Sequence, residues 1–453
     1  MLVRNRSLYL FLLISFYSTM ALSEDWPHWR GPDFNGSSKA TNLPVRFSQT
    51  ENIKWAAALP GPAASTPIVM GELIFLTTFE PEQTNVLALA IERASGDLRW
   101  QRVLGKGEND RQGGMENYMA SPSPVVDEQR VIFFSGRGEL VAFSHDGDEQ
   151  WRWNIQEKYG DFNYMWGYGS SPLLFGGRLF IQVLHRDQPY PQQKIRKQSP
   201  ESYLLAIDPS NGEPIYQHKR ITDAIGETRE GYSTPIPRVI DGREEILVVG
   251  GDYLTAHDPQ TGSELWRFGD WNPQKITHWR LIPSPVVAGD VILAAAPKHG
   301  PVMGVVATGR KVSSRWELDR DTTDTPTPAY YKGRVFLLNG KKRVLSCVDP
   351  QAGKTLATLR LPGARYMRAS PTVADDKVYC MNADGEVFVV GIKGLGEKPQ
   401  LGDTQSQRDT EDAIQFQLLH QTNMGGYPAR STIVAVNRQV FIRTSEALYC
   451  VGD

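Results

Sequence analysis

The feature that most constrains the fold is a short pattern that recurs along the whole chain. In each copy, a Ser-Pro or Thr-Pro dipeptide stands before an apolar run. The seven complete copies are Thr66-Pro67, Ser123-Pro124, Ser171-Pro172, Thr234-Pro235, Ser284-Pro285, Thr327-Pro328 and Ser370-Pro371. An eighth, degenerate copy is Ser431-Thr432-Ile433, where Ile replaces Pro. The copies are 43 to 63 residues apart, which is typical of a repeat architecture with loops of variable length.

Each copy contains the same succession of short strands. After the first strand comes a turn such as Val287-Ala288-Gly289-Asp290, and then a second apolar strand such as Val378-Tyr379-Cys380-Met381. A third strand ends in an acid, as in Leu205-Ala206-Ile207-Asp208, and a Gly turn with an aromatic four residues later follows, as in Gly96 to Trp100. Four short strands bounded by Gly, Pro and Asp turns describe one propeller blade. The sequence therefore predicts an all-β chain, an eight-bladed β-propeller of four-stranded antiparallel blades.

The aromatic of the fourth strand supplies apolar area where neighbouring blades diverge. We expect Trp100, Trp151 and Trp266 to pack between blades. In the fifth copy Trp316 stands out of register, and in the sixth Ala357 takes the aromatic position.

Two of the three cysteines share a position with small residues of the third strand. Cys347 and Cys450 correspond to Ala206 and Ala256. This correspondence favours small buried hydrophobes over metal ligands or nucleophiles. An odd number of cysteines also indicates that disulfides are not the framework of the fold.

The last copy ends at Leu448-Tyr449-Cys450-Val451 without a fourth strand, and Asn52-Ile53-Lys54-Trp55 has the pattern of the missing one. We therefore expect the ring to be closed by an N-terminal strand, which removes the open edges. The competing arrangement, seven blades plus a separate fragment, leaves Trp55 without a partner.

The N-terminus has the pattern of a secretory signal: Arg4 and Arg6, an apolar run from Leu8 to Phe16, and small residues up to Ser23. A membrane anchor is the alternative, but the apolar core is shorter than the ~20 residues that span a bilayer. The expected organisation is a signal peptide at 1–23, an N-terminal leader at 24–50 and the propeller at 51–453. This predicts a periplasmic or secreted protein without a membrane span.

The charges are nearly balanced, with 49 Lys and Arg against 51 Asp and Glu. Such a balance gives no global attraction to nucleic acid or to an anionic membrane surface. We expect a monomer that does not bind nucleic acid.

The pattern S-P…G-x-V-Y…L-x-A-L-D-x-x-T-G-x-x-x-W resembles the repeat of the pyrroloquinoline-quinone (PQQ)-like propellers, from about residue 50 to 453. Trp26-Pro27-His28-Trp29-Arg30-Gly31-Pro32 is similar to the W-P-x-x-R-G-P leader that precedes such propellers in exported bacterial proteins. The resemblance implies two functional classes. Quinoprotein alcohol and glucose dehydrogenases hold PQQ and Ca²⁺ in the funnel of the propeller. The propeller lipoprotein of the outer-membrane assembly machinery binds partner proteins and no quinone.

The chain departs from both classes. It has no adjacent cysteines and no acidic set that matches the calcium ligands of the dehydrogenases, and it has no lipobox cysteine. We favour a binding or scaffold propeller for a protein partner or a small ligand, without cofactor, metal or catalytic residues. The alternative is a PQQ- and calcium-dependent dehydrogenase of alcohols or sugars.

The loops that precede the Ser/Thr-Pro marks carry aromatic and charged residues toward one mouth of the channel. Stacking aromatics and Arg groups suit carboxylates or phosphates. An alternative remains open, in which these aromatics plug the hydrophobic ends of the blades. The insert from His185 to Glu201 is expected to overhang the same mouth, and Asp319 to Asp324 is expected to be a solvated turn. The candidate ligand-binding residues are Glu116, Tyr118, Tyr168, Tyr232, Trp279, Arg280, Arg368 and Arg430.

Overall fold

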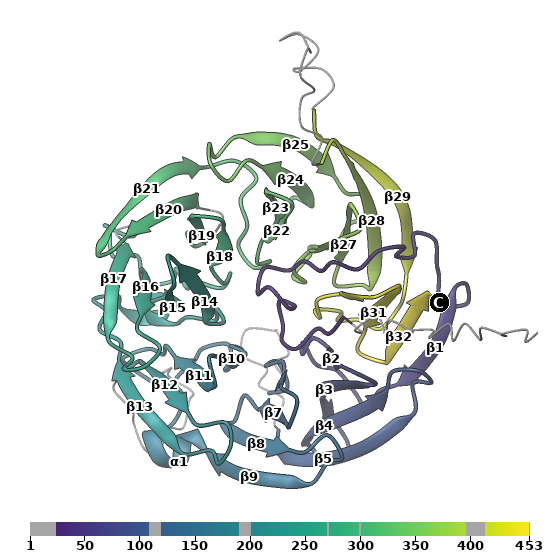
Figure 1. The fold of residues 1–453 in the computed structure, drawn as a ribbon, viewed down its shortest axis with the longest axis horizontal. Coiled ribbons are helices and arrows are strands. Elements are labelled where there is room, and N and C mark those ends of the chain that lie inside the picture. Colours follow the sequence, from purple (N-terminus) through teal and green to yellow (C-terminus); the bar gives the residue numbers. More distant parts are fainter. Residues whose placement is uncertain are drawn as a thin grey trace, which may run out of the picture.

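The computed structural model describes residues 24–107, 119–189, 201–269, 271–298, 300–395 and 413–452. In these ranges the chain forms eight four-stranded antiparallel sheets that stand around a common axis as blades (Figure 1). The predicted all-β, eight-bladed propeller is confirmed. Residues 1–23, interpreted above as a signal peptide, lie outside the described residues. Within the described ranges, no helix has the length and apolar character needed to cross a membrane.

Each blade starts with its innermost strand at the axis and ends with its outermost strand at the rim (Figure 1). The strands of blades 1 to 4 are β2 (Ile68–Met70), β3 (Leu73–Glu80), β4 (Asn85–Glu92) and β5 (Leu98–Lys106); β6 (Val125–Val126), β7 (Val131–Phe134), β8 (Glu139–Phe143) and β9 (Glu149–Asn154); β10 (Leu173–Phe175), β11 (Arg178–Val183), β12 (Tyr203–Ile207) and β13 (Pro214–Lys219); β14 (Ile236–Ile240), β15 (Arg243–Gly250), β16 (Tyr253–His257) and β17 (Glu264–Gly269).

Blades 5 to 7 repeat this order, and blade 8 takes its outermost strand from the N-terminal part of the chain. Their strands are β18 (Val286–Ala288), β19 (Val291–Ala295), β20 (Val302–Thr308) and β21 (Lys311–Leu318); β22 (Ala329–Tyr331), β23 (Arg334–Asn339), β24 (Val344–Val348) and β25 (Thr355–Arg360); β26 (Thr372–Ala374), β27 (Lys377–Met381), β28 (Glu386–Lys393) and β29 (Gln415–Asn423); β30 (Val434–Val436), β31 (Gln439–Arg443), β32 (Ala447–Gly452) and β1 (Ile53–Ala58). Two short helices lie in the loops after blades 2 and 3, α1 (Ile155–Tyr159) and the 3-10 helix η2 (Gly226–Arg229).

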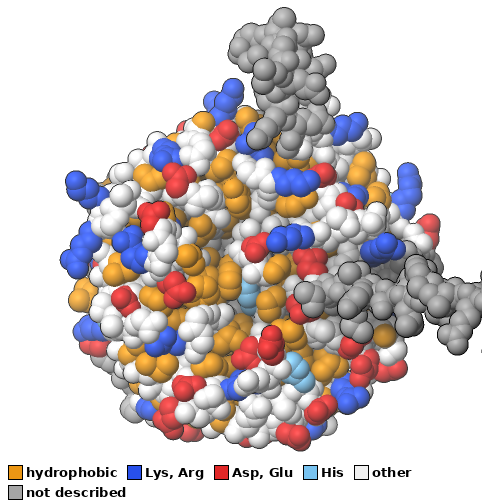
Figure 2. Space-filling view, viewed as in Figure 1, with side chains coloured by type: hydrophobic (Ala, Val, Ile, Leu, Met, Phe, Trp, Pro, Cys, Tyr) orange, Lys and Arg blue, Asp and Glu red, His pale blue; other side chains and the backbone are white. Residues whose placement is uncertain are grey.

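The two middle strands of a blade are apolar because neighbouring blades cover both of their faces. In β4 every residue from Asn85 to Ile91 is buried, whereas the outer strand β5 is largely exposed apart from Trp100 and Leu104. The core therefore consists of apolar layers between blades. On the face drawn in Figure 2, hydrophobic side chains gather toward the centre and most Lys and Arg side chains lie toward the rim.

The outer-strand aromatic of one blade packs against the Gly turn of the next. A Cβ added to Gly147 would lie 2.8 Å from Cγ of Trp100. The Nε1 of Trp100 donates to the carbonyl of His145 at 2.8 Å, and the Nε1 of Trp151 donates to the carbonyl of Pro209 at 2.9 Å. The turn requires Gly both for this close approach and for its positive φ of 86°.

The junction between blades 4 and 5 lacks such a turn. The Nε1 of Trp266 donates at 3.3 Å to Glu245 in its own blade. Arg238 pairs with Glu245 at 3.0 Å, and both side chains are buried. The Arg238 guanidinium also donates to the carbonyl of Ala307 in blade 5, so a buried ion pair joins the two blades at this place. Trp100 and Trp266 are buried and Trp151 is half-buried, as expected for residues that pack between blades.

The prediction that Trp316 is out of register is wrong. Trp316 lies opposite Gly304, as Trp266 lies opposite Ala256, and each pair stands beside a bulge. Its Nε1 donates to the carbonyl of Pro350 in blade 6 at 2.7 Å. The spacing in sequence differs because β20 and β21 continue into a tight hairpin, where Thr308 pairs with Lys311.

The Ser or Thr of each repeat links neighbouring blades around the axis. In each link the backbone N–H of one such residue donates to the side-chain hydroxyl of its counterpart in the adjacent blade. The N···O distances run from 2.7 to 3.2 Å for Thr66 to Ser123, Ser123 to Ser171, Ser171 to Thr234, Thr234 to Ser284, Ser284 to Thr327, Thr327 to Ser370, and Thr432 to Thr66. We call these eight residues the hydroxyl ring. The degenerate copy belongs to it because Thr432 keeps the hydroxyl although Ile433 replaces Pro.

The ring is closed by β1, as predicted. Trp55 pairs with Cys450 and Ala57 with Leu448 in an antiparallel ladder. The chain therefore has eight blades rather than seven blades and a fragment. Cys347, Cys380 and Cys450 are free and buried, which confirms Cys347 and Cys450 as small core residues.

The leader before β1 runs across the centre of the propeller (Figure 1). Trp26 is fully buried and pairs with Val69 of β2, whereas Ser37 pairs with Val373 of β26. Arg30 is also buried, and its guanidinium donates to the carbonyls of Pro328 and Pro371 at 2.8 and 3.3 Å. The leader thus joins blade 1 to blades 6 and 7.

Candidate functional site

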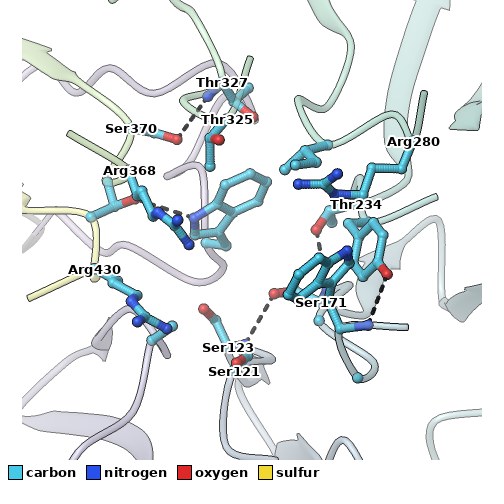
Figure 3. Close-up of a pocket in the computed structure, with 18 of the residues that line it drawn as sticks. Ser121, Ser123, Ser171, Thr234, Arg280, Thr325, Thr327, Arg368, Ser370 and Arg430 are labelled. Carbon is cyan, nitrogen blue, oxygen red and sulfur yellow. Dashed lines mark hydrogen bonds between the residues drawn. The ribbon is translucent and has the colours of Figure 1, made fainter. Parts of the chain in front are cut away.

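A pocket of about 290 Å³ lies at the mouth of the channel. Loops that join the outer strand of one blade to the inner strand of the next surround it, and the leader also contributes to its wall. The predicted residues Tyr232, Arg280, Arg368 and Arg430 line this pocket. Figure 3 shows Arg280 projecting into it from one side and Arg368 and Arg430 from the other. Six members of the hydroxyl ring also line it: Ser123, Ser171, Thr234, Thr327, Ser370 and Thr432.

The leader supplies Trp29 to the pocket. The Nε1 of Trp29 donates to Oγ1 of Thr432 at 3.2 Å, so the indole is attached to the hydroxyl ring. The guanidinium of Arg30 lies 5.5 Å from the centre of the same indole. Elsewhere the leader contacts the hairpin turns at the other end of the inner strands, where His28 and Phe34 line a second cavity with Phe175. The leader therefore enters from the hairpin end and presents Trp29 at the mouth.

One wall of the pocket is held by a charged network from the loop after blade 3. Oε1 of Glu227 accepts hydrogen bonds from Arg280 at 2.8 Å and from the Nε1 of Trp166 at 2.9 Å. The Arg280 guanidinium lies 5.4 Å from the centre of the Trp166 ring. These contacts hold the Arg280 guanidinium in one orientation before any ligand binds. Less side-chain entropy is therefore lost when a ligand binds.

Behind this wall lies a second carboxylate, Glu230, which is fully buried. It accepts a hydrogen bond from the hydroxyl of Tyr232 and another from the backbone N–H of Met165 at 3.0 Å, and it pairs with Arg186 at 3.4 Å. Burial raises the pKa of Glu230 to about 7, although the hydrogen bonds and Arg186 oppose the rise. Burial likewise raises the pKa of Tyr232 well above its ordinary value. Tyr232, which lines the pocket, therefore contacts the buried Glu230 directly.

Two further predicted residues that the structure describes, Tyr168 and Trp279, do not line the pocket. Tyr168 is buried, its hydroxyl donates to the carbonyl of Gln182 at 2.7 Å, and its ring stacks on Phe162 at 4.8 Å. The expectation that Tyr168 faces the mouth is wrong, because its ring packs between blades 2 and 3 against Phe134 and Phe162. Trp279 is half-buried beside the pocket, and its backbone N–H donates to Thr228 at 2.8 Å. Glu116 and Tyr118 lie outside the described residues, as do residues 190–200 of the insert.

The lining residues that the sequence did not predict include Trp29, Trp166 and Asp324. Asp324 belongs to the segment expected to be a solvated turn, but it lines the pocket and accepts a hydrogen bond from the N–H of Lys298 at 2.8 Å. Trp166 belongs to the same loop as the predicted residue Tyr168, two residues away. Which of the two rings faces the mouth depends on the backbone conformation of that loop. Trp29 belongs to the leader motif, and the sequence does not indicate where the leader binds on the propeller.

The charged groups that line the pocket among the described residues are three guanidiniums and the carboxylate of Asp324. Each guanidinium offers five donors in a fixed fork. Among the described residues, no three His, Cys, Asp or Glu side chains come together in a way that holds a metal ion. Burial raises the pKa of each cysteine to about 12, so none of the three is a poised thiolate. The three guanidiniums are suited to binding an anionic group.

Comparison with known proteins adds the family. A family model described as outer membrane protein assembly factor BamB matches residues 47–181 and 186–393. BamB from Moraxella catarrhalis is 12% identical with a TM-score of 0.58, over 88% of this chain and 97% of that one. Quinohemoprotein alcohol dehydrogenase from Comamonas testosteroni is 13% identical with a TM-score of 0.64, over 95% and 81% of the two chains. A europium-containing methanol dehydrogenase is 10% identical with a TM-score of 0.62, over 94% and 90%. No curated protein sequence matches the chain significantly.

Proposed function

Because the chain belongs to the PQQ-like propeller family whose model is described as outer membrane protein assembly factor BamB, we propose that it is a binding propeller. Its pocket at the channel mouth receives a small ligand or a segment of a protein partner. The solved structures that resemble it are too distant in sequence to show more than the fold, and one fold hosts unrelated activities. The pocket itself supports a binding function.

The observation that supports this proposal most is the convergence of Arg280, Arg368 and Arg430 on one concave site. These residues come from loops after three different blades, so only the closed ring brings them together. Arg280 is held by Glu227, and Trp29 adds an aromatic surface from the leader. A concave site with a few converging polar groups is the usual form of a ligand pocket.

The proposal includes export. Residues 1–23 act as the signal peptide, residues 24–50 as the leader that docks in the channel, and residues 51–453 as the propeller, which works as a monomer in the periplasm or outside the cell. The family description, which names outer-membrane assembly, supports such a compartment.

A pocket-filling variant tests the binding function. Gly169 lines the pocket, and a Cβ added to it meets nothing within 4 Å, so Gly169→Trp fills the site without a backbone clash. A photoreactive phenylalanine in place of Tyr366, an exposed residue whose hydroxyl contacts Arg368, would report a bound partner in the cell. Native mass spectrometry of the purified protein would report a small ligand.

We expect a crosslinked species or a bound mass that disappears in the Gly169→Trp variant. The same photoreactive residue at Val239, which is exposed on β14 of blade 4 and does not line the pocket, is the control and should yield no such species. Crosslinks and bound masses that persist unchanged with Trp at position 169 would contradict a function of this pocket.

The second candidate function is a PQQ- and calcium-dependent dehydrogenase. The likeness of the fold to alcohol and methanol dehydrogenases over most of the chain supports this candidate. The guanidiniums suit the carboxylates of the quinone. The described residues do not supply a ligand set for its calcium ion, so no oxidation step follows from them. Incubation with PQQ and Ca²⁺ separates the two functions: bound quinone absorbance together with dye reduction by alcohols or sugars would overturn the binding-only proposal.

A further inference from the structure

The leader and blades 2 and 3 form a second cavity at the hairpin end of the propeller, opposite the mouth, where the leader crosses the centre (Figure 1). Its volume is about 300 Å³, and it shares no lining residue with the pocket at the mouth. We call it the leader cavity. Its apolar lining includes Pro27, Pro32 and Phe34 of the leader and Leu174, Phe175 and Pro209 of blade 3.

The size of the leader cavity selects among apolar ligands. An engineered apolar cavity of ~150 Å³ takes up one benzene ring. The leader cavity has about twice that volume, so two fused rings fill it better than one and leave fewer wall atoms without contacts. Gly176 and Gly177 lie at its edge and are exposed, and a Cβ added to Gly177 meets nothing within 4 Å. This turn therefore leaves the cavity an entrance from solvent.

One wall of the leader cavity is built from aromatic rings. The rings of His28 and Phe34 stack at 3.8 Å with an interplanar angle of 10°, and Phe34 meets Phe175 edge to face at 6.1 Å. Burial, together with the charge of Arg30, lowers the pKa of His28 to about 3, so this wall is uncharged at neutral pH. Because Phe34 and Phe175 are each only half-buried, a further ring can pack against them in an offset or edge-to-face arrangement.

The carboxylate of Asp127 gives the leader cavity a direction for hydrogen bonding. Its Oδ1 accepts from the backbone N–H groups of Gln129 at 2.8 Å and Arg130 at 2.9 Å, which hold the side chain in place. The Nε of Arg130 lies 3.9 Å from the same oxygen and partly balances the charge. Oδ2 accepts no hydrogen bond from the described residues. A neutral ligand with one donor therefore suits this carboxylate, whereas an anion is repelled by it.

We propose that the leader cavity binds a flat bicyclic aromatic group that carries one N–H or O–H donor, of the size of an indole. The rings pack against Phe34 and Phe175, and the donor binds Asp127. Because four of the lining residues belong to the leader, the bound aromatic also stabilises the docked leader. The site is separate from the pocket at the mouth, so this inference does not depend on the proposed function.

Isothermal titration calorimetry of the full protein tests the class of ligand. Indole is the probe, benzofuran has the same shape without the donor, and indole-3-carboxylate adds a negative charge. We expect indole to bind at one site about tenfold more tightly than benzofuran, because its N–H bonds to a charged acceptor. Indole-3-carboxylate should bind more weakly than indole. No binding of indole, equal affinities for indole and benzofuran, or tighter binding of the carboxylate would overturn the proposal.

Asp127→Asn tests the hydrogen bond to the ligand. The variant keeps an oxygen for the two backbone N–H groups but replaces the second carboxylate oxygen with an amide nitrogen, which donates. We expect the affinity for indole to fall about tenfold and the affinity for benzofuran to stay within about twofold. A merely structural role of Asp127 would weaken both ligands alike, and equal losses would therefore refute the assignment.

The repeat supplies a matched pair that locates the rings. Phe175 lies opposite Arg178 at the end of β10, and Tyr331 lies opposite Arg334 at the same place in β22. Both aromatics are half-buried, but only Phe175 lines the leader cavity. Phe175→Ala should weaken indole binding about three- to tenfold, and Tyr331→Ala should change it by less than about twofold. Equal effects of the two variants would place the indole elsewhere.

Two further comparisons identify the source of the aromatic group and separate the two sites. If a Gly-Trp-Gly amide binds as well as indole does, the ligand is a tryptophan side chain of a partner; if only indole binds, it is a free small molecule. Gly169→Trp fills the pocket at the mouth and should leave the affinity for indole unchanged. Loss of indole binding in this variant would place the indole at the mouth and refute the inference. Failure of indole to bind the wild-type protein would also refute it, but would leave the proposed function of the mouth untouched.

Discussion

Replacement of Trp100 by Ala measures how much one aromatic contributes to the joint between two blades. The indole is 6% exposed and lies 5.6 to 6.1 Å, between ring centres, from Phe75, Phe133 and Phe143. Its removal leaves a cavity that these rings cannot fill, because each is held in its own strand. It also deprives the carbonyl of His145 of its donor. We expect the free energy of unfolding to fall by about 3–5 kcal/mol.

The Gly turn provides a second variant that is coupled to the first. In Gly147→Ala the new methyl group meets Cγ of Trp100 at 2.8 Å and adopts a φ near 86°. The crowding costs about 1–3 kcal/mol and the positive φ about 1–2 kcal/mol. In the Trp100→Ala background the crowding disappears and only the cost of the backbone conformation remains. The double variant should therefore be more stable than additivity predicts, by about 1–3 kcal/mol.

Urea unfolding followed by both far-UV circular dichroism and fluorescence measures these energies. Leu98→Ala is the matched control, because Leu98 lies on the same strand and is 55% exposed; its effect should stay within about 0.5 kcal/mol. A Trp100→Ala variant within about 1 kcal/mol of wild type, or strict additivity with Gly147→Ala, would refute the proposed joint between blades 1 and 2.

Three further predictions follow from buried groups. Burial raises the native pKa of Glu230 from 4.5 to about 7, so the protonated side chain stabilises the native state at low pH and this contribution is lost as the pH rises through 7. Between about pH 5 and 8, the Glu230→Gln variant should therefore lose about 2 kcal/mol less stability than wild type. Equal losses of the two proteins in urea unfolding would contradict this. Because burial raises the pKa of Cys347, Cys380 and Cys450 to about 12, a thiol reagent near neutral pH should label them only after denaturation; rapid labelling of the native protein would show an accessible thiolate. Arg30→Ala leaves the carbonyls of Pro328 and Pro371 without their donor and should lower stability by about 2–3 kcal/mol, whereas Lys39→Ala at an exposed leader position should not; equal unfolding midpoints for the two variants would argue against a docked leader.

The architecture could be predicted because each repeat contains the residues that contact the neighbouring blade. A Ser or Thr before each inner strand supplies the hydroxyl that the neighbouring blade binds, and the degenerate copy at Thr432 keeps that hydroxyl. Trp316 was misplaced because spacing was counted along the chain from a Gly turn. In the structure, pairing with Gly304 sets the position of Trp316, and the hairpin that joins β20 to β21 has a different length from those of the other blades.

The site was harder to predict than the fold because loops have no period. The arginines before the inner strands could be identified, since a charged residue next to a strand start faces the mouth in most orientations. The choice between Tyr168 and Trp166 depends on how one loop turns, and burial of Tyr168 against Phe162 decides it. Trp29 could not be assigned because its partner, Thr432, is 403 residues away in sequence.

The same long separation has a consequence for biosynthesis. Glu24 donates its backbone N–H to Asn437, and β1 finds its ladder partner only in β32, the last strand described. When the N-terminal segment emerges from a ribosome or a translocation pore, every group that it will bind in blades 6 to 8 is still missing. Until the rest of the chain arrives, β1 must therefore remain unpaired, and the apolar face of blade 1 that blade 8 covers must remain exposed. Such a state is prone to wrong pairing. Completion of the ring is thus a late event, timed by the arrival of the final forty residues or so, roughly one blade.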